Sequence, residues 1–368
     1  MNIQVEDIRK ALATVQEPDL KKDLVTLNMV KDIAVNGKEV SFTVVLTTPA
    51  CPLKEKIRQD CEAAIHQISA DLVVRITMTA NVNTLRSATP IMPKVKNIIA
   101  IASGKGGVGK STVTANLAVA LARTGAKVGL IDADIFGPSI PTMFNCETAQ
   151  PGVMKQGDRN IIIPVEQYGV KLLYIGFLTP ADGAIVWRGP MASSAFRQFM
   201  IDAEWGELDY MLIDMPPGTS DIHLTLVQTV AVTGVVIITT PQKVALADAQ
   251  KGLAMFTQKQ INVPVLGVIE NMAYFTPAEL PDNKYYIFGK DGGKVLAARN
   301  DVEFLGEVPL VQSIREAGDN GKPIVMTSEI VANAFEDVAK SLARAVALRN
   351  LQEPTQKVEF TVHSHPTH

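Results

Sequence analysis

The pattern of apolar and polar positions divides the chain into two parts of different character. In the first part, Val5, Ile8 and Leu12 recur at helical spacing, which predicts an amphipathic helix. Predicted strands over 29–35 and 40–46 flank the hairpin signal Asn36-Gly37. A helix over 52–68 and a strand over 73–78 follow. The order helix, strand, strand, helix, strand predicts a small α+β domain over residues 1–84.

The second part alternates short apolar strands with longer helical patterns, which predicts a doubly wound, mostly parallel α/β sheet over residues 97–352. The predicted strands cover 97–102, 127–132, 161–164, 170–175, 210–214, 235–239, 263–269 and 304–309. Predicted helices follow residue 109 and cover 187–201, 246–260 and 328–350. Residues 85–96 carry two prolines without periodicity and are predicted to be a linker. The polar tail, 353–368, is predicted to be disordered; its three histidines are a weak alternative as metal ligands.

Composition narrows the class of protein. The 368 residues are 47% hydrophobic and 20% charged, which suits a globular protein of about two domains. A net charge of −3 offers no bulk attraction to nucleic acid or to an anionic membrane. The three cysteines make no disulfide framework. No secretion signal and no apolar run of membrane-spanning length is present, so we expect a cytoplasmic protein.

A glycine-rich loop between the strand 97–102 and the next helix carries the first chemistry. Gly104 to Ser111 fits the pattern GxxxxGK[ST] in the strand–loop–helix context that confirms a phosphate-binding loop. Glycines let several backbone N–H groups converge, and the helix dipole points at the same place. We expect Lys110 to bind the outer phosphates of ATP and Ser111 to ligate Mg²⁺. The predicted nucleotide contacts are Gly104, Lys105, Gly106, Gly107, Val108, Gly109, Lys110, Ser111 and Thr112.

A second lysine, Lys105, stands where an ordinary phosphate loop needs none. A cation there can neutralise phosphate charge in its own subunit or in a partner, although a solvated surface lysine is the simpler alternative. The sequence Gly104 to Thr112 resembles the deviant Walker A loop of the nitrogenase iron protein and MinD group.

Acidic residues end two of the predicted strands, at the edge of the sheet where ligands bind in open α/β folds. Asp134, in Asp132-Ala133-Asp134, is the expected residue for orienting the attacking water, while Asp132 supports the Mg²⁺ shell or the strand end. Residues 135–141 are predicted to form a switch loop, with an ordinary capped turn as the alternative. Asp214 is predicted to hold Mg²⁺, and Gly218 to present its N–H to the γ-phosphate.

Two further positions are candidates on local chemistry. Asn271 follows a predicted strand, and its amide offers a donor and an acceptor to a purine base. Cys51 precedes Pro52, the predicted first turn of a helix, where a thiol would have a lowered pKa and be a better metal ligand. A small buried apolar cysteine is the alternative for Cys51, and Cys61 is predicted to be a core residue.

The chain resembles the Mrp/ApbC family of ATPases that carry iron–sulfur clusters, through Gly104–Thr112, Ile131–Ser139, Trp187–Pro190, Asp214–Thr219 and Glu270–Met272. Its first domain resembles the small PaaD/SufT-like domain, through Asp19-Leu20, Asp23–Val25, Met29-Val30 and Pro49–Leu53. The resemblance implies a homodimer that hydrolyses ATP, binds a cluster between subunits and passes it to apo iron–sulfur proteins or assembly machinery. The resemblance of the first domain raises Cys51 as an iron–sulfur ligand. From the net charge we expect neither nucleic acid nor membrane as a partner.

One departure from the family keeps a second hypothesis open. Members of the family usually carry a CxxC pair soon after the Glu-Asn-Met segment, whereas residues 274–282 here contain no cysteine. Thiolates are the ligands that iron–sulfur clusters need. A nucleotide-switched dimeric scaffold without a bound cluster is therefore the alternative. A membrane-positioning ATPase is disfavoured, because the tail after Pro354 is too polar for an amphipathic anchor.

Overall fold

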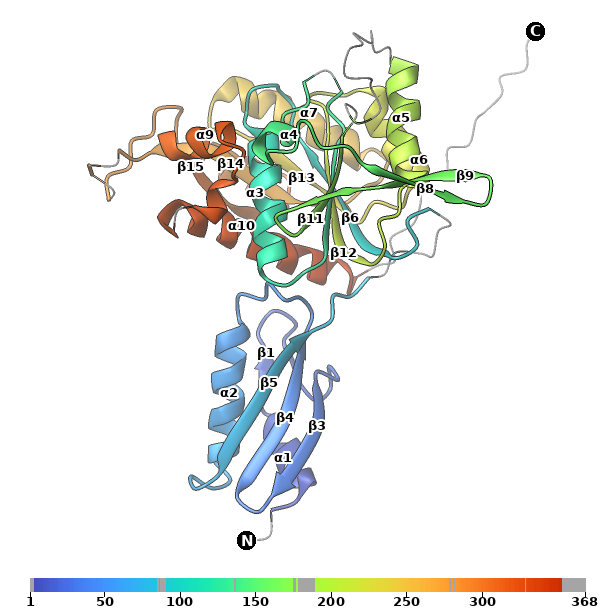
Figure 1. Ribbon diagram of the computed structural model, residues 1–368. Coiled ribbons are helices and arrows are strands. Elements are labelled where there is room, and N and C mark those ends of the chain that lie inside the picture. Colours follow the sequence, from blue (N-terminus) through green and yellow to red (C-terminus); the bar gives the residue numbers. More distant parts are fainter. Residues whose placement is uncertain are drawn as a thin grey trace, which may run out of the picture. The chain divides into compact units, whose positions relative to one another are not determined.

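The computed structural model describes residues 3–84, 86, 91–135, 137–174, 177, 189–277, 279–280, 282–327 and 329–352. The chain forms two compact units, residues 1–83 and 84–368, which are treated separately below (Figure 1). Several features predicted from the sequence lie outside the described residues: Trp187 and Arg188, Phe136 in the predicted switch loop, and the tail 353–368.

The first unit is a three-stranded sheet with two helices. Its elements are α1 (Val5–Leu12), β1 (Gln16–Glu17), β2 (Lys22–Asp23), β3 (Val30–Asn36), β4 (Glu39–Leu46), α2 (Lys54–His66) and β5 (Val73–Ala80). Strand β4 lies in the middle, antiparallel to β3 and parallel to β5. Alternate residues of β4, namely Val40, Phe42, Val44 and Leu46, are buried and share one core with Ile57 and Ile65 of α2. One apolar face of the sheet therefore holds the helices, as period-two alternation predicts.

The second unit is organised by an eight-stranded sheet. Its order is β10-β11-β7-β12-β6-β13-β14-β15, and every neighbouring pair is parallel except β10 with β11. The strands are β6 (Val95–Ala102), β7 (Val128–Asp132), β10 (Val165–Gln167), β11 (Val170–Tyr174), β12 (Leu208–Asp214), β13 (Gly234–Thr239), β14 (Val265–Phe275) and β15 (Phe304–Leu310).

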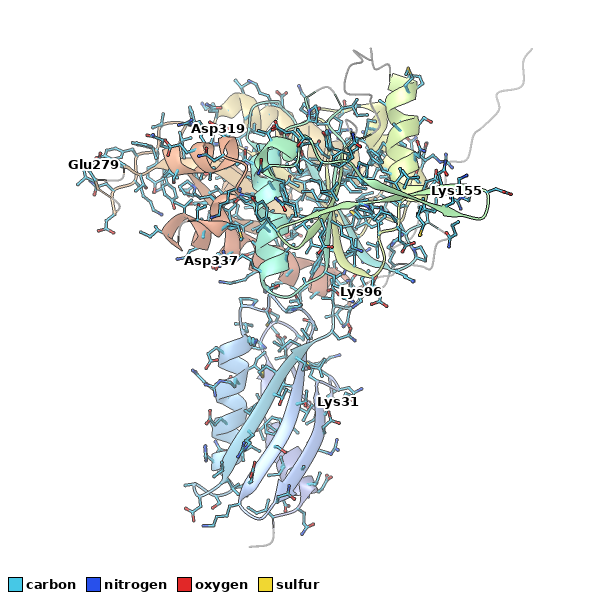
Figure 2. All side chains as sticks on the ribbon, in the orientation of Figure 1. Lys31, Lys96, Lys155, Glu279, Asp319 and Asp337 are labelled. Carbon is cyan, nitrogen blue, oxygen red and sulfur yellow. The ribbon has the colours of Figure 1, made fainter. Side chains whose placement is uncertain are left out.

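The described helices of this unit are α3 (Lys110–Arg123), α4 (Ile140–Met143), α5 (Gly189–Ile201), α6 (Asp221–Thr229), α7 (Lys243–Thr257), α8 (Gly292–Arg299), α9 (Gln312–Asp319), the 3₁₀ turn η2 (Ile324–Met326) and α10 (Glu329–Arg349). A separate two-stranded hairpin, β8 (Gly152–Gln156) and β9 (Arg159–Ile163), projects from the sheet with Lys155 near its tip (Figures 1 and 2).

Helices cover both faces of the sheet. In β6, Ile98, Ala100 and Ala102 share a core with apolar residues of α5, α6, α7 and α8. The alternate residues Ile99 and Ile101 are also buried but point to the opposite face, where α3 and α10 lie (Figure 1). A strand that is buried on both faces reads as a continuous apolar run, which is why the sequence of β6 does not alternate. The predicted doubly wound, mostly parallel architecture is confirmed.

The structure differs from the predicted elements in several places, and helices α6, α8 and α9 and strand β10 were not predicted. Strand β6 begins at Val95, and Met92 is a buried core residue, so the end of the predicted linker belongs to the second unit. The Arg86 guanidinium donates to the carbonyls of Met92 and Val95, at 2.9 and 2.5 Å, and holds this segment in place. Strand β14 continues to Phe275 instead of ending at Met272, and the β8 strand was not predicted.

The topology brings the carboxyl ends of the central strands to one edge. Strand β6 lies between β12 and β13, and the loop from Ser103 to Gly109 joins it to α3. Ligands bind at this edge in open α/β sheets. None of the helices in the described part of the chain combines the length and the apolar character needed to cross a bilayer.

Candidate functional site

A cavity of about 200 Å³ lies where the glycine-rich loop meets α3. It is lined by Ser103, Lys105, Gly106, Gly107, Gly109, Lys110, Ser111, Thr112, Asp134, Ser139, Met143 and Pro217. The structure thus brings the loop, Asp134 just beyond the end of β7 and Pro217 in the segment after Asp214 around one space. Lys110 is buried, whereas Lys105 is exposed on the rim.

The glycines of the loop serve separate purposes. Gly107 and Gly109 have φ angles of +81° and +76°, in the left-handed region that favours glycine. A Cβ at position 104 would overlap the backbone carbonyl of Asp248 in α7, so this position requires glycine. A Cβ at Gly109 would overlap the side-chain amide of Asn271. The loop is therefore clamped between α7 and β14, and its conformation is set by packing as well as by local freedom.

A buried ion pair lies at the base of this cavity. Lys110 Nζ is 2.8 Å from Asp214 Oδ2, and the two side chains are 6% and 0% exposed. The Ser111 hydroxyl donates to the same oxygen at 2.5 Å, and the Thr114 hydroxyl lies 2.8 Å from Asp214 Oδ1. The strand-end carboxylate predicted for β12 is thus in contact with both functional residues of the loop. Thr114, which the sequence analysis did not single out, completes its surroundings.

The donor set fits a small divalent cation. Mg²⁺ prefers hard oxygen ligands and is usually held by one or two protein groups together with phosphates and water. A serine hydroxyl and a carboxylate in direct contact are ligands of this kind, and the Lys110 ammonium already places positive charge beside them. In the described part of the chain, no group of three or more His, Cys, Asp or Glu side chains could form a metal cage. Ser111 and Asp214 are the residues that would hold Mg²⁺.

Asp132 organises the loop that carries Asp134. Its carboxylate accepts hydrogen bonds from the backbone N–H groups of Asp134, Ser139 and Ile140, at 3.0, 3.2 and 3.2 Å. Burial and the neighbouring Asp214 carboxylate raise the pKa of Asp132 to about 8. Asp132 therefore acts through the backbone: its carboxylate holds the N–H groups of Asp134, Ser139 and Ile140, and Asp134 and Ser139 line the cavity.

The backbone N–H of Gly218, which was predicted to contact a phosphate, has a partner within the protein. The Gly218 N–H donates to the carbonyl of Ser103 at 2.9 Å, in a left-handed conformation with φ +75°. The Ser103 hydroxyl in turn donates to the carbonyl of Lys105 at 3.0 Å. A contact between the Gly218 N–H and a phosphate would require this backbone hydrogen bond to be exchanged, so the predicted contact stays a prediction.

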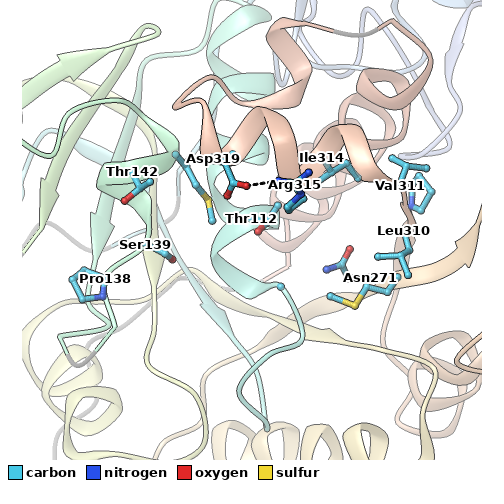
Figure 3. Close-up of a pocket in the computed structure, with 15 residues that line it drawn as sticks. Thr112, Pro138, Ser139, Thr142, Asn271, Leu310, Val311, Ile314, Arg315 and Asp319 are labelled. Carbon is cyan, nitrogen blue, oxygen red and sulfur yellow. Dashed lines mark hydrogen bonds and ion pairs between the residues drawn. The ribbon is translucent and has the colours of Figure 1, made fainter. Parts of the chain in front are cut away.

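A second, larger cavity of about 490 Å³ adjoins the first (Figure 3). Gly109, Thr112, Asn271 and Met272 form the side nearest the glycine-rich loop. The other walls are Pro138, Ser139, Thr142 and Met143 around α4, and Pro309, Leu310, Val311, Ile314, Arg315, Gly318 and Asp319 from β15 and α9. The sequence analysis missed this last wall. The available signal was its position after the last strand, since ligand sites gather at carboxyl ends of parallel strands.

Asn271, the residue predicted to contact a purine base, lines this larger cavity. Its Nδ2 donates to the carbonyl of Val108 at 2.8 Å, and the residue is 5% exposed. An amide carries two N–H groups and one acceptor oxygen, so this bond leaves one N–H and the oxygen for a ligand. Asn271 thus ties β14 to the phosphate loop in addition to lining the cavity.

The expectation for the Cys51 thiol was wrong in its electrostatics. Helix α2 begins at Lys54 with Leu53 as its N-cap, so Cys51 lies outside the first turn. Burial raises the pKa of Cys51, and the carboxylates of Glu17 and Asp19 raise it further. The thiol is half-buried beside the core of the first unit. Burial likewise raises the pKa of Cys61 to about 12, as expected for a core residue.

Both units match models of known protein families. Residues 5–78 match a family model described as iron-sulfur cluster assembly protein, and residues 94–343 match one described as NUBPL iron-transfer P-loop NTPase. An iron-sulfur cluster carrier protein of Synechocystis sp. is 47% identical over 353 residues, which are 95% of this chain and 99% of that protein. A protein of the same description from Deinococcus radiodurans is 45% identical, over 94% of this chain and 96% of its own length.

A solved structure is similar as well. It is a nucleotide-binding protein from Archaeoglobus fulgidus in complex with ADP, and it is 40% identical, with a TM-score of 0.54. The similarity covers 62% of this chain and 88% of that one.

Gly104 and Gly106 provide a test of the packed loop. Gly104→Ala should lower the free energy of unfolding by about 1–3 kcal/mol, because the added methyl group displaces the backbone of α7. Gly106→Ala is the matched control, since its methyl group would lie 3.8 Å from the nearest atom, on Pro217. Chemical denaturation measures both. Equal stability of the two variants would contradict the close approach.

Asp214 allows a test of the buried ion pair. If Lys110 moves from Asp214 to a nucleotide phosphate, it leaves a carboxylate that is 0% exposed without its cation. Stranding a buried charge costs about 3–5 kcal/mol. Asp214→Asn removes that charge, so we expect it to bind nucleoside triphosphate more tightly than wild type when Mg²⁺ is absent, and to gain little when Mg²⁺ is added. Calorimetric titration with and without Mg²⁺ measures this, and weaker binding by the variant in the absence of Mg²⁺ would refute it.

Proposed function

We propose that this chain, which belongs to the NUBPL iron-transfer P-loop NTPase family, hydrolyses ATP and carries iron–sulfur clusters to recipient apoproteins. The observation that carries the nucleotide part is the small cavity in which Lys105, Lys110, Ser111 and Asp134 line one space beside the buried Asp214. The cargo part rests on the relatives that are named as cluster carriers and on the match of the first unit to the assembly-protein family.

The proposed reaction is phosphoryl transfer to water, which depends on positioning and on charge stabilisation. Backbone N–H groups of the loop and the ammonium of Lys110 bind the β- and γ-phosphates. Asp134, held on the cavity wall by the turn that Asp132 organises, directs the attacking water. Mg²⁺ bound at Ser111 and Asp214 supplies charge neutralisation on the phosphate oxygens.

The proposed base is adenine, and the larger cavity is its site. A volume of about 490 Å³, with the apolar side chains of Pro309, Leu310, Val311 and Ile314 in one wall, suits a purine and its ribose. Asn271 offers the polar edge that fixes the orientation of the base. The ADP bound to the similar Archaeoglobus fulgidus protein supports this choice.

A homodimer follows from the same proposal. Lys105 lines the phosphate cavity but is exposed, as a lysine that reaches a neighbouring subunit needs to be. The segment after β14 also exposes Tyr285, Tyr286 and Ile287, at 47%, 40% and 60%. Exposed aromatic side chains of this kind are typical of protein interfaces. We also propose a cytoplasmic location, which the three unpaired cysteines of the chain support.

Cys51 is the proposed contact to the cargo. It is the most accessible of the three thiols, since Cys61 and Cys146 are buried. Two copies of the chain would contribute two such thiols. The absence of a cysteine from residues 274–282 favours the second candidate function, a nucleotide-switched dimeric scaffold that binds no cluster.

Lys110 tests the hydrolytic assignment. Lys110→Ala should lower the rate of ATP hydrolysis by at least about 10²–10³-fold, because a buried cation aimed at the transferred phosphate is lost. Lys155→Ala, on the exposed β8 strand, is the control and should hydrolyse ATP as wild type does. Phosphate release at steady state measures the rate. Wild-type turnover by Lys110→Ala would reject the assignment.

Cys51 decides between the two candidate functions. After anaerobic reconstitution with iron and sulfide, we expect wild type to show visible absorption and bound iron, and Cys51→Ser to lose both. Cys61→Ala, which removes a buried thiol from the same unit, should retain them. Iron content per chain and the visible spectrum are the measurements. Wild type without iron would favour the scaffold, and equal iron in Cys51→Ser would remove Cys51 as a ligand.

A further inference from the structure

Thr114 is a buried polar residue in the middle of an apolar helix. Helix α3 is almost entirely buried, and Thr114 is 0% exposed between Val113 and Ala115. Its hydroxyl lies 2.8 Å from Asp214 Oδ1 and 2.9 Å from the carbonyl of Lys110. Threonine is a weaker helix former than alanine, so its presence here calls for a reason beyond packing.

The hydroxyl has one proton and two acceptors within reach. The Lys110 carbonyl is the ordinary i−4 acceptor of a helical threonine, and its oxygen is neutral. The Asp214 carboxylate is charged, and hydrogen bonds to charged acceptors are about twice as strong as neutral ones. The proton therefore favours Asp214, and this donor comes from the helix that begins in the phosphate loop.

The two oxygens of Asp214 thus have different partners. Oδ1 faces Thr114, while Oδ2 faces Ser111 and Lys110, at 2.5 and 2.8 Å. The terminal torsion of an aspartate is broad and has no sharp rotamer of its own. Thr114 is β-branched and stiff, and it sits on a packed helix. Its hydrogen bond therefore fixes the rotation of the carboxylate and directs Oδ2 toward Ser111 and Lys110, which line the phosphate cavity.

We propose that Thr114 is a positioning residue for the metal-binding carboxylate of Asp214, an inference that rests on the nucleotide site proposed above. When Lys110 transfers to a phosphate, Oδ2 loses its lysine partner, and Thr114 remains as a donor that holds Oδ1 in place. The carboxylate is then oriented for the cation before the cation arrives. Thr114 acts through Asp214 and touches neither the nucleotide nor the reacting water.

A generic role in helix stability is separable from this one, because the chain contains a matched threonine. Thr229, at the end of α6, is 3% exposed and donates its hydroxyl to the carbonyl of Thr225 at 2.6 Å. Among the described contacts it has no carboxylate partner. Thr229→Val removes a buried helical hydroxyl of the same kind, so it reports what such a loss costs by itself.

The test is metal binding, followed without turnover. Mn²⁺ is titrated into the full chain with a non-hydrolysable ATP analogue, and free Mn²⁺ is counted by electron paramagnetic resonance. Thr114→Val should raise the Kd for Mn²⁺ about tenfold, the effect of losing one hydrogen bond to a charged group. Thr114→Ser, which keeps the hydroxyl, and Thr229→Val should match wild type. Affinity for the analogue without metal should be unchanged in all three variants.

Each result has a distinct meaning. Unaltered Mn²⁺ binding by Thr114→Val overturns the positioning role, and so does an equal shift in Thr229→Val. If wild type itself binds neither analogue nor Mn²⁺, the proposed nucleotide function fails before this inference is reached. If Thr114→Val does not fold, Thr114→Ala against Thr114→Ser provides the same comparison, and the positioning role then requires weaker Mn²⁺ binding in the alanine variant alone.

Discussion

The ion pair between Lys110 and Asp214 joins the two segments on which the nucleotide site depends. Lys110 opens α3, and Asp214 closes β12, the strand that lies beside β6 in the sheet. Both side chains are buried, so water does not screen their charges. Each charge is therefore compensated mainly by the other. Any ligand that draws Lys110 away must therefore compensate Asp214. This constraint couples the phosphate groups to the divalent cation through the protein itself.

The same edge of the sheet carries a second buried carboxylate. Asp132 and Asp214 are paired in register at the ends of β7 and β12, so the two acids lie on adjacent strands. Burial, together with the like charge of Asp214, raises the pKa of Asp132. The two acids are nonetheless used differently. Asp214 is surrounded by side-chain donors from α3, whereas Asp132 is surrounded by backbone N–H groups of the loop that follows it. In the proposed site Asp214 would hold the cation, while Asp132 holds the backbone of the loop.

The sequence was informative where the chemistry is local. Lys110 and Ser111 are consecutive residues at a strand–loop–helix junction, so their pattern predicted their place without any knowledge of the sheet. Thr114 could not be recognised in this way, because its partner is a hundred residues away and meets it only when β12 pairs beside β6. The α9 wall of the larger cavity has no chemical signature of its own. For Cys51, the proline was visible in sequence, but the burial that raises its pKa is a tertiary property.

The thiols of the chain bear on how a cargo could be released. An iron–sulfur cluster is usually held by four cysteine thiolates. The chain has three cysteines, and Cys61 and Cys146 are buried, so the half-buried Cys51 is the proposed ligand. Two copies then supply two thiolates, and the remaining ligands must come from elsewhere. A cluster held by Cys51 of two subunits would lack part of its usual set of cysteine thiolates, so its attachment to the proposed carrier would be incomplete. Such a complex suits transfer to a recipient that offers a full set of cysteines better than it suits storage.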